Sequence, residues 1–242
     1  MGQLVNIVVA NGVATITLDS PANRNALSQQ LLVDFHIALD SAEASAARVV
    51  VLAHAPPAFC AGADLKERAA GKVDSTSFVA AIERLGTLQA PVIAAVDGPV
   101  RAGGIGLMAA CDLVVVNPSI TFAFTEVRIG VAPAIITAPI LQRCGWSKLA
   151  AAYLTGDVFD APRALDMGLI THITPDVGAT VAELSSDIML GGPNAVAATK
   201  TLLRQPHSIN DLQALSESLF TSDEGREGLA ALAEKRPPRW AR

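Results

Sequence analysis

Two apolar runs that each end in a turn of small residues place the strongest constraint on how this chain folds. Residues 49–53 (VVVLA) lead into AFCAGADLKE, and residues 91–96 (PVIAAV) lead into DGPVRAGGIG. A short, uninterrupted apolar run is typical of a strand that is buried on both faces. The small residues that follow keep side chains away from places where another group approaches the backbone. We therefore expect two buried strands, each followed by a tight turn and a helix.

The rest of the pattern alternates strands with helices and then becomes helical. Asn11-Gly12 lies between two β-rich runs and is a strong hairpin signal. The pattern predicts strands at 5–9, 13–18, 49–53, 91–96, 113–116 and 120–124, and helices at 28–39, 78–88, 105–110, 141–154, 161–167, 177–190, 195–203 and 211–220. Alternation of this kind predicts an α/β fold.

Composition and charge argue against several classes of protein. The chain of 242 residues is 51% hydrophobic and 17% charged, which excludes disorder, and its net charge of -5 argues against a nucleic-acid partner. Cys60, Cys111 and Cys144 are odd in number and widely spaced, so we expect reduced thiols, and no metal-ligand spacing is present. We see no signal peptide, and no stretch reaches the roughly 18 apolar residues of a membrane span. We expect a cytoplasmic protein with no membrane partner.

The two glycine turns indicate a site for a negatively charged oxygen. Residues 60–64 (CAGAD) and 101–106 (RAGGIG) each lie between an expected strand and an expected helix. Free backbone N–H groups gather at helix N-termini, where the macrodipole favours negative charge. Two such turns brought together supply two donors to one oxygen, which is an oxyanion hole. The spacing fits neither a dinucleotide motif nor a P-loop, and each turn alone is also compatible with a simple tight connection.

Glu126 is the candidate acid–base residue. It stands in the largely apolar stretch FAFTEVRIGVAPA, residues 122–134. Burial in such surroundings raises the pKa of a carboxyl group, which suits general acid–base catalysis. An ion pair with Arg128 and a solvated loop position are the alternative interpretations.

Taken together, these stretches resemble the crotonase superfamily, the enoyl-CoA hydratase/isomerase family. SPANRNALS resembles the family's P-x-x-x-N-A-L segment, and AFCAGADLKE and PVIAAVDGPVRAGGIGLMAACDLVV resemble its two oxyanion turns. FAFTEVRIGVAPA resembles its catalytic-glutamate segment, while LTGDVFDAPRALDMGLITHI and EGLAALAEKRPPRW resemble later helical landmarks. These six segments occur in family order over nearly the whole chain. The resemblance implies a crotonase fold, which is a spiral of ββα units followed by a helical C-terminal segment.

The resemblance also assigns roles to residues. The N–H groups of Ala63 and Gly103 match the two oxyanion donors, and their guest is the carbonyl oxygen of an acyl-CoA thioester. Glu126 matches the acid–base residue, and the N–H of Ala134 matches a position that helps to hold water. The residues implied in CoA binding are Ala22, Arg24, Ala61, Asp64, Leu65, Lys66 and Lys235. Because CoA is part of the substrate, no separate cofactor is implied.

Gly106 departs from the family members that use two glutamates. In those hydratases, one glutamate lies three positions after the oxyanion glycine of the second turn, which is Gly106 here, and the other matches Glu126. We interpret the chain as an enoyl-CoA hydratase that adds water reversibly to a 2-enoyl-CoA with a single glutamate. A Δ3,Δ2-enoyl-CoA isomerase or another crotonase reaction is the alternative. A non-catalytic acyl-CoA-binding protein is the alternative of a different class.

The clearest linker, Gly191-Gly192-Pro193, divides the chain into two expected parts. Residues 1–190 are expected to form the crotonase-type core with the CoA and catalytic site, and residues 191–242 a helical segment for oligomerisation that covers the CoA site. The resemblance implies a homotrimer or a dimer of trimers, in which a lysine matching Lys235 often reaches CoA across a subunit boundary. Residues 66–78 are expected to form a mobile lid over the acyl group.

Overall fold

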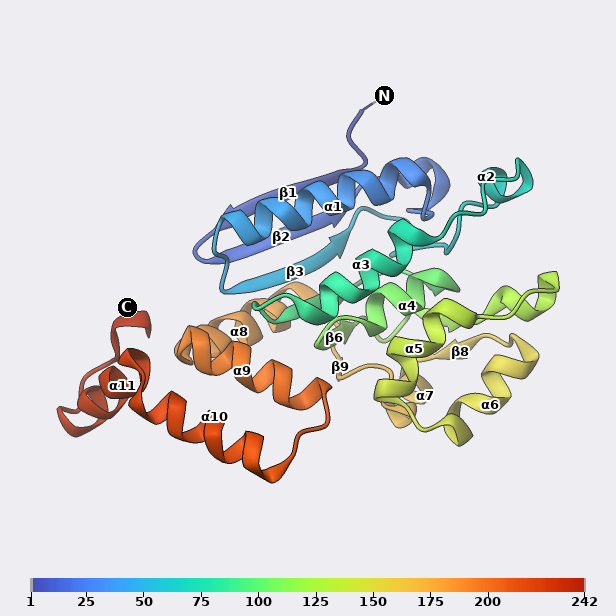
Figure 1. The fold of residues 1–242 in the computed structure, drawn as a ribbon. Helices are drawn as coiled ribbons and strands as arrows, with labels where there is room; N and C mark the ends of the chain where they lie inside the picture. The colour runs from blue at the N-terminus through green and yellow to red at the C-terminus, as the bar shows by residue number, and fades with distance from the viewer. Residues whose placement is uncertain (1, 242) are drawn as a thin grey trace.

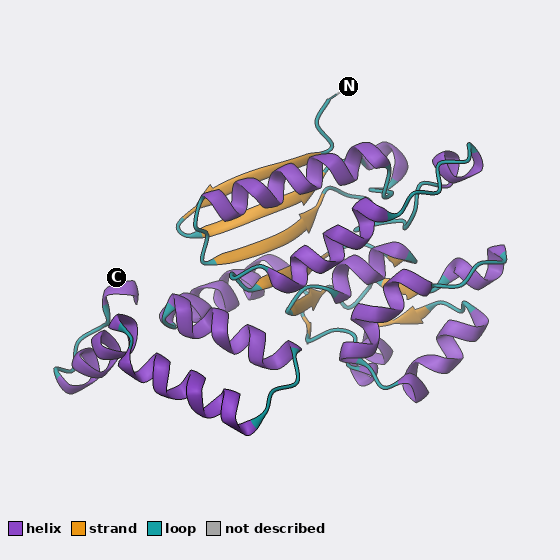
Figure 2. Cartoon of the chain, viewed as in Figure 1, coloured by secondary structure: helices purple, strands orange, loops and turns teal. Residues whose placement is uncertain are grey.

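The chain forms two β-sheets packed among helices, with a helical extension at its C-terminal end (Figure 1 and Figure 2). The structure is a computed structural model and describes residues 2–241. The strands are β1 Val5–Ala10, β2 Val13–Leu18, β3 Val49–His54, β4 Val92–Val96, β5 Val100–Arg101, β6 Leu113–Val116, β7 Thr121–Ala123, β8 Phe159–Asp160 and β9 His172–Ile173. The helices are α1 Gln29–Ala44, α2 Leu65–Ala69, α3 Thr76–Thr87, α4 Gly103–Ala109, α5 Ala134–Arg143, α6 Trp146–Thr155, α7 Ala161–Met167, α8 Val177–Leu190, α9 Pro193–Arg204, α10 Ile209–Thr221 and α11 Asp223–Ala233. Short 3-10 helices are η1 Pro21–Asn23, η2 Thr125–Ile129 and η3 Arg239–Ala241.

The first four strands belong to a large sheet, and from β4 onward the chain passes back and forth between this sheet and a small one. The large sheet has the order β1-β2-β3-β4-β6-β9, and the small one has the order β5-β7-β8. The β1–β2 and β7–β8 pairs are antiparallel, and the other strand pairs are parallel. Strand β4 of the large sheet is followed by β5 of the small one, and β6 is followed by β7. The segments that follow β4 and β6 therefore both reach the small sheet, where β5 and β7 lie next to each other.

The predicted hairpin is confirmed. Asn11 and Gly12 both have positive φ, at 50° and 76°, which is the backbone that a two-residue hairpin turn needs. The next element, α1, begins after Ser28, whose side chain accepts a hydrogen bond from the N–H of Leu31 at 3.2 Å. Leu31, together with Phe35 one turn later, is fully buried in the main core. The sequence therefore predicted the hairpin and the start of α1, although α1 continues to Ala44, beyond the predicted end at residue 39.

The single helix predicted over residues 141–154 is wrong. Helix α5 begins earlier, at Ala134, and ends at Arg143, and α6 starts at Trp146. Cys144 and Gly145 between them have extended backbone, and Gly145 caps α6. Apolar residues continue through the break because both helices cover the same core, so the pattern concealed the bend.

The C-terminal helices extend away from the sheets. Figure 1 shows α10 and α11 at one end of the molecule, with α2 at the opposite end. Helix α10 has no buried side chain. Helix α11 returns to the α8–α9 junction, where Glu224 accepts hydrogen bonds from the N–H groups of Asn194 and Ala195 at 3.0 and 2.9 Å. The predicted division after residue 190 stays a prediction.

No helix within residues 2–241 combines the length and the apolar character that crossing a bilayer requires. The stretch predicted to be a lid contains α2 and the start of α3.

Candidate functional site

The two glycine turns lie against each other in the structure. Cys60 bridges Val100 in parallel fashion, and the N–H of Arg101 donates to the carbonyl of Cys60 at 3.0 Å. The N atom of Ala63 lies 3.7 Å from the point where a Cβ on Gly103 would stand. The two predicted donors, Ala63 and Gly103, are therefore neighbours. Within residues 2–241, neither of their N–H groups donates a hydrogen bond to another group.

Glycine is required for this approach at two positions. A Cβ on Gly62, where φ is +90°, would lie 2.9 Å from the Cβ of Ala102 and 3.3 Å from the N of Gly103. A Cβ on Gly104 would lie 2.7 Å from the Cβ of Cys60. Real Cβ atoms do not come so close, so any larger residue would push the turns apart. Cys60 itself is fully buried, and burial raises the pKa of its thiol to about 12, so it stays neutral.

Strand β7 brings Glu126 to the same place. Strand β5 pairs with β7, and the N–H of Ala102 in the second turn donates to the carbonyl of Ala123 at 3.0 Å. Glu126 follows three residues later, in η2. Gly130 ends η2 in the left-handed conformation, with φ at 77°, and its N–H turns back toward the carbonyls of Glu126 and Val127. The small sheet therefore holds the three predicted segments side by side.

The side chain of Glu126 is partly buried, and one of its two carboxyl oxygens has no hydrogen-bond partner. Its Oε2 atom is inaccessible to solvent and pairs with no group among residues 2–241. Burial raises the pKa of Glu126 above its usual 4.5. The predicted alternative of an ion pair with Arg128 is not formed, because Arg128 pairs with Asp157 at 2.6 Å. A carboxyl oxygen that is buried and unpaired, on a segment joined to the second glycine turn, is typical of an acid–base residue.

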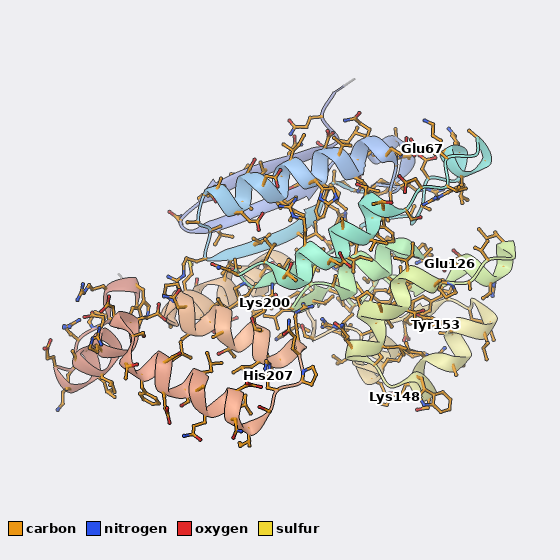
Figure 3. The ribbon with its side chains drawn as sticks, viewed as in Figure 1. Glu67, Glu126, Lys148, Tyr153, Lys200 and His207 are labelled. Atoms are coloured by element: carbon orange, nitrogen blue, oxygen red, sulfur yellow. The ribbon has the colours of Figure 1, made fainter. Side chains whose placement is uncertain are left out.

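Tyr153 of α6 is a neighbour of Glu126 that the sequence did not reveal. Figure 3 shows the two labelled side chains on adjacent elements. The ring of Tyr153 lies 4.3 Å from that of Phe124, centroid to centroid. Its hydroxyl is buried and has no hydrogen-bond partner in the described residues. Burial raises the pKa of Tyr153, and the negative charge of Glu126 adds to the rise.

A buried asparagine fixes the loop that carries Ala22 and Arg24. Asn25 is fully buried, and its Oδ1 accepts a hydrogen bond from the N–H of Ser20 at 2.7 Å. Its Nδ2 donates to the carbonyls of Ala55 at 2.9 Å and Ala58 at 2.8 Å. This side chain therefore joins the loop to the segment that leads into the first glycine turn.

The structure brings together six of the seven residues predicted to bind CoA. The carbonyl of Arg24 accepts from the N–H of Ala61 at 3.0 Å, and Asn23 donates to Asp64 at 3.2 Å. Ala22, Arg24, Leu65 and Lys66 are exposed at this end of the molecule. The exception is Lys235, which follows α11 at the opposite end of the same chain (Figure 1).

Gly106 faces a side chain of α5. A Cβ on Gly106 would lie 2.3 Å from Cγ2 and 2.6 Å from Cβ of Ile136. Ile136 therefore fills the space that a side chain at 106 would need. The N–H of Ala134, predicted to hold water, donates to the carbonyl of Ala132 at 2.8 Å in this structure. Its role in holding water stays a prediction.

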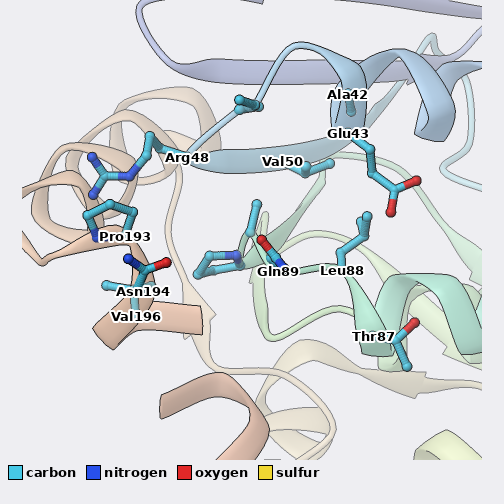
Figure 4. A pocket seen from close by; sticks show the side chains of 14 residues that line it. Ala42, Glu43, Arg48, Val50, Thr87, Leu88, Gln89, Pro193, Asn194 and Val196 are labelled. Atoms are coloured by element: carbon cyan, nitrogen blue, oxygen red, sulfur yellow. The ribbon is translucent and has the colours of Figure 1, made fainter. Parts of the chain in front are cut away.

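A pocket of about 490 Å³ elsewhere in the molecule contains none of the predicted site residues (Figure 4). It lies between the end of α1, the start of β3 and the start of α9. Its charged residues are already paired: Glu43 binds Arg84 at 2.6 Å, and Arg48 donates to the carbonyl of Gly191 at 2.6 Å. The glycine turns, and not this pocket, combine free donors with an unpaired carboxyl group.

Comparison with known proteins decides the family. The sequence matches the family described as enoyl-CoA hydratase/isomerase over residues 9–242. The chain belongs to the enoyl-CoA hydratase/isomerase family. It is 34% identical to a putative enoyl-CoA hydratase of Thermus thermophilus, over 94% of this chain and 97% of the relative.

Two solved structures from this family resemble the chain closely. An enoyl-CoA hydratase/isomerase from Marinobacter aquaeolei gives a TM-score of 0.92 at 26% identity and covers 100% of both chains. An enoyl-CoA hydratase from Mycobacterium avium is 42% identical with a TM-score of 0.77, and the match covers 99% of this chain and 100% of that one. The predicted crotonase fold is therefore confirmed.

The residues that sequence reasoning missed in this member of the enoyl-CoA hydratase/isomerase family share one property. Ile136 and Tyr153 contact residues far away in the chain, and the same is true of Asn25, which belongs to the quoted P-x-x-x-N-A-L segment but whose side-chain contacts were not predicted. Tyr153 is the single tyrosine in the sequence, but nothing in its neighbours marks it. By contrast, Gly62 and Gly103 stood out because small residues interrupt an apolar pattern.

Proposed function

We propose that the protein hydrates a 2-enoyl-CoA thioester, with Glu126 as the only acid–base residue and the N–H groups of Ala63 and Gly103 as the oxyanion hole. The observation that carries this proposal is the buried, unpartnered Oε2 of Glu126, beside two turns whose N–H groups are also unpartnered. The name of the Thermus thermophilus relative supports hydration. The six clustered residues from Ala22 to Lys66 would hold the CoA portion of the substrate.

The reaction needs no group beyond these and water. Glu126 takes a proton from a water molecule as the water oxygen bonds to C3 of the substrate. The electrons of the C2–C3 double bond shift toward the thioester, and the carbonyl oxygen becomes an enolate. The carbonyl re-forms as Glu126 returns the proton to C2, so that one water has been added and Glu126 is ionised again. CoA remains part of the substrate throughout.

In this mechanism the reaction is accelerated by selective stabilisation of the enolate. The N–H groups of Ala63 and Gly103 bind the oxygen more strongly as its negative charge grows, which lowers the barrier without holding the substrate too tightly. Neither donor depends on a side chain. This is why alanine and glycine suffice at these positions, and why the glycines that let the turns touch are the critical residues.

A second candidate reaction is isomerisation of a 3-enoyl-CoA to a 2-enoyl-CoA. The observation that favours it is Gly106, whose place is filled by the apolar Ile136, so that Glu126 has no partner carboxylate. A single base can take a proton from C2 and return it to C4, with the dienolate held in the same oxyanion hole. The Marinobacter aquaeolei protein carries both activities in its name.

The test follows the absorbance of the conjugated enoyl thioester. We expect the wild-type protein to remove this absorbance from crotonyl-CoA. Replacement Glu126→Gln should keep the fold and CoA binding while lowering turnover about 100-fold or more, as expected for loss of a general acid–base group. Glu183→Gln, an exposed residue of α8, is the control for loss of one carboxylate.

Each outcome decides between the candidates. Loss of absorbance with wild type and Glu183→Gln, but not with Glu126→Gln, supports hydration by Glu126. If the absorbance of crotonyl-CoA does not change but a 3-enoyl-CoA gains absorbance, the result supports isomerisation. Full turnover by Glu126→Gln would refute the proposed role of this residue. Binding of CoA esters without turnover of either substrate would point to a binding protein.

A further inference from the structure

Helices α4 and α5 are locked together at one point beside the oxyanion turn. Position 106 has no side chain, and Ile136 occupies the space where one would stand. The Cγ2, Cβ and Cα atoms of Ile136 lie 2.3, 2.6 and 3.2 Å from an ideal Cβ on Gly106. Two of these distances are shorter than real Cβ contacts, and the third is to the backbone of α5. A larger residue at 106 therefore cannot enter unless α5 moves or residue 136 becomes smaller.

This contact lies within one helical turn of a proposed catalytic donor. Gly106 comes three residues after Gly103, so both lie on the same face of α4. A side chain on a helix leans toward the helix N-terminus and covers the turn that precedes it. Ile136 occupies that place at position 106, one turn along α4 from Gly103, whereas Leu27 and Phe78 pack beside Gly103 itself.

Ile136 also lies on the segment that carries Glu126. Helix α5 starts at Ala134, four residues after Gly130 closes the turn that begins at Glu126. Ile136 itself is buried, with 2% of its surface exposed. The side chain that faces position 106 is therefore apolar, and it lies on the helix that follows the Glu126 turn.

We propose that Ile136 determines the reaction specificity of the site, because it keeps a second acid–base group, and the water such a group would hold, away from the substrate. The inference rests on the proposed function and extends it. Water addition needs a water molecule placed against C3, whereas double-bond migration needs only the proton that Glu126 carries from C2 to C4. An apolar side chain beside the oxyanion turn therefore lowers hydration relative to migration.

The first experiment compares two isoleucines of the same helix. Ile136→Ala opens the space at position 106, and Ile140→Ala removes an equally buried side chain one turn further along α5. Both variants should have a lower Tm. We expect only Ile136→Ala to raise the ratio of crotonyl-CoA hydration to 3-hexenoyl-CoA isomerisation, by about threefold or more, because water gains access to the reacting carbon.

A second pair of variants tests the space itself. Gly106→Glu alone should lower the Tm and both activities, since its side chain collides with Ile136. In Gly106→Glu combined with Ile136→Ala, the carboxylate has room. We expect this double variant to raise the hydration ratio about tenfold over Ile136→Ala, which is less than the roughly 100-fold or more that a well-positioned acid–base group contributes.

The outcomes separate this inference from the proposed function. If wild type turns over neither substrate, the proposed function fails, and the inference about specificity fails with it. If wild type is active but Ile136→Ala and Ile140→Ala shift the ratio equally, Ile136 is only a packing residue. If Gly106→Glu is as stable and active as wild type, the two helices are not locked at this point.

Discussion

At the scale of single residues, the site differs from most of the chain because it contains buried polar atoms without hydrogen-bond partners. Buried polar groups are normally paired, yet the Oε2 of Glu126 and the hydroxyl of Tyr153 are not. Asn25, by contrast, satisfies the rule with three hydrogen bonds. The side chain of Asn25 therefore has a structural role in holding the loop, whereas the unpaired oxygen of Glu126 is the one that the proposed function uses.

The raised pKa of Glu126 predicts a pH dependence of stability. The folded protein binds the proton of Glu126 more tightly than the unfolded chain does. The resulting penalty is absent below the unfolded pKa, near 4.5, and fully present above the folded pKa. We expect Glu126→Gln to unfold at a higher denaturant concentration than wild type at pH 7, with the difference disappearing near about pH 4. Equal midpoints at pH 7 would contradict the desolvated state of this carboxyl group.

The raised pKa of Glu126 also predicts how kcat depends on pH at the acidic end. Hydration needs ionised Glu126, so kcat should fall at low pH around a midpoint above 4.5.

At the scale of elements, α4 is anchored at the end that the substrate does not reach. Its N-terminal turn presents Gly103, and cations bind the carbonyls at its other end. Arg143 donates to Cys111 at 2.7 Å, and Arg204 donates to Ala110 at 2.7 Å. These cations offset the negative end of the helix, so the positive end faces the site. The sequence predicted α4 but could not predict this anchoring, since Arg204 lies 94 residues away from Ala110.

Helix α2 gives a test at the same scale. Its N-cap, Asp64, accepts hydrogen bonds from the N–H groups of Lys66 at 2.9 Å and Glu67 at 3.2 Å, and from Asn23 at 3.2 Å. Loss of such a cap costs about 1 kcal/mol. Asp64→Ala should therefore raise the KM for the enoyl-CoA about fivefold while kcat changes little, since α2 carries proposed CoA contacts.

Steady-state kinetics with Asp64→Asn as the control checks this prediction. Asparagine keeps the accepting Oδ1, so its KM should stay close to that of wild type. A fall in kcat with unchanged KM in Asp64→Ala would show that the cap serves the chemistry and not binding.

At the scale of the whole molecule, local patterns predicted the α/β core, and distant contacts determined the rest. The hairpin and most helices follow from periodicity in neighbouring residues. The break at Gly145 was missed because the apolar pattern runs through it. The family resemblance implied that the two glycine turns and Glu126 form one site. The pairing of β5 with β7 that connects them was not predicted, because no strand was expected at residues 100–101.

Features of the C-terminal segment lead us to expect that several copies of the chain assemble into an oligomer. Ile209 and Phe220 on α10 are 77% and 63% exposed in the single chain, and the predicted CoA contact Lys235 lies far from the other CoA residues. From both observations we propose that the chain assembles as the expected trimer or dimer of trimers and that α10 takes part in the contact between subunits. We expect sedimentation to give a mass of several chains for wild type and a shift toward one chain for Phe220→Asp.

The control for this prediction is Ser218→Asp, which adds the same charge about half a turn around α10 from Phe220. It should sediment as wild type does. A wild-type protein that sediments as a single chain would contradict the predicted assembly.

The contact between Gly106 and Ile136 also restricts the order in which descendants of this sequence can change. A carboxylate at 106 is harmful while isoleucine stands at 136, and a small residue at 136 leaves a cavity while glycine stands at 106. Either substitution alone lowers stability, whereas both together replace one well-packed pair of residues with another. Packing between α4 and α5 would therefore oppose a change of Gly106 to glutamate that is not accompanied by a change at Ile136, whatever reaction the site performs.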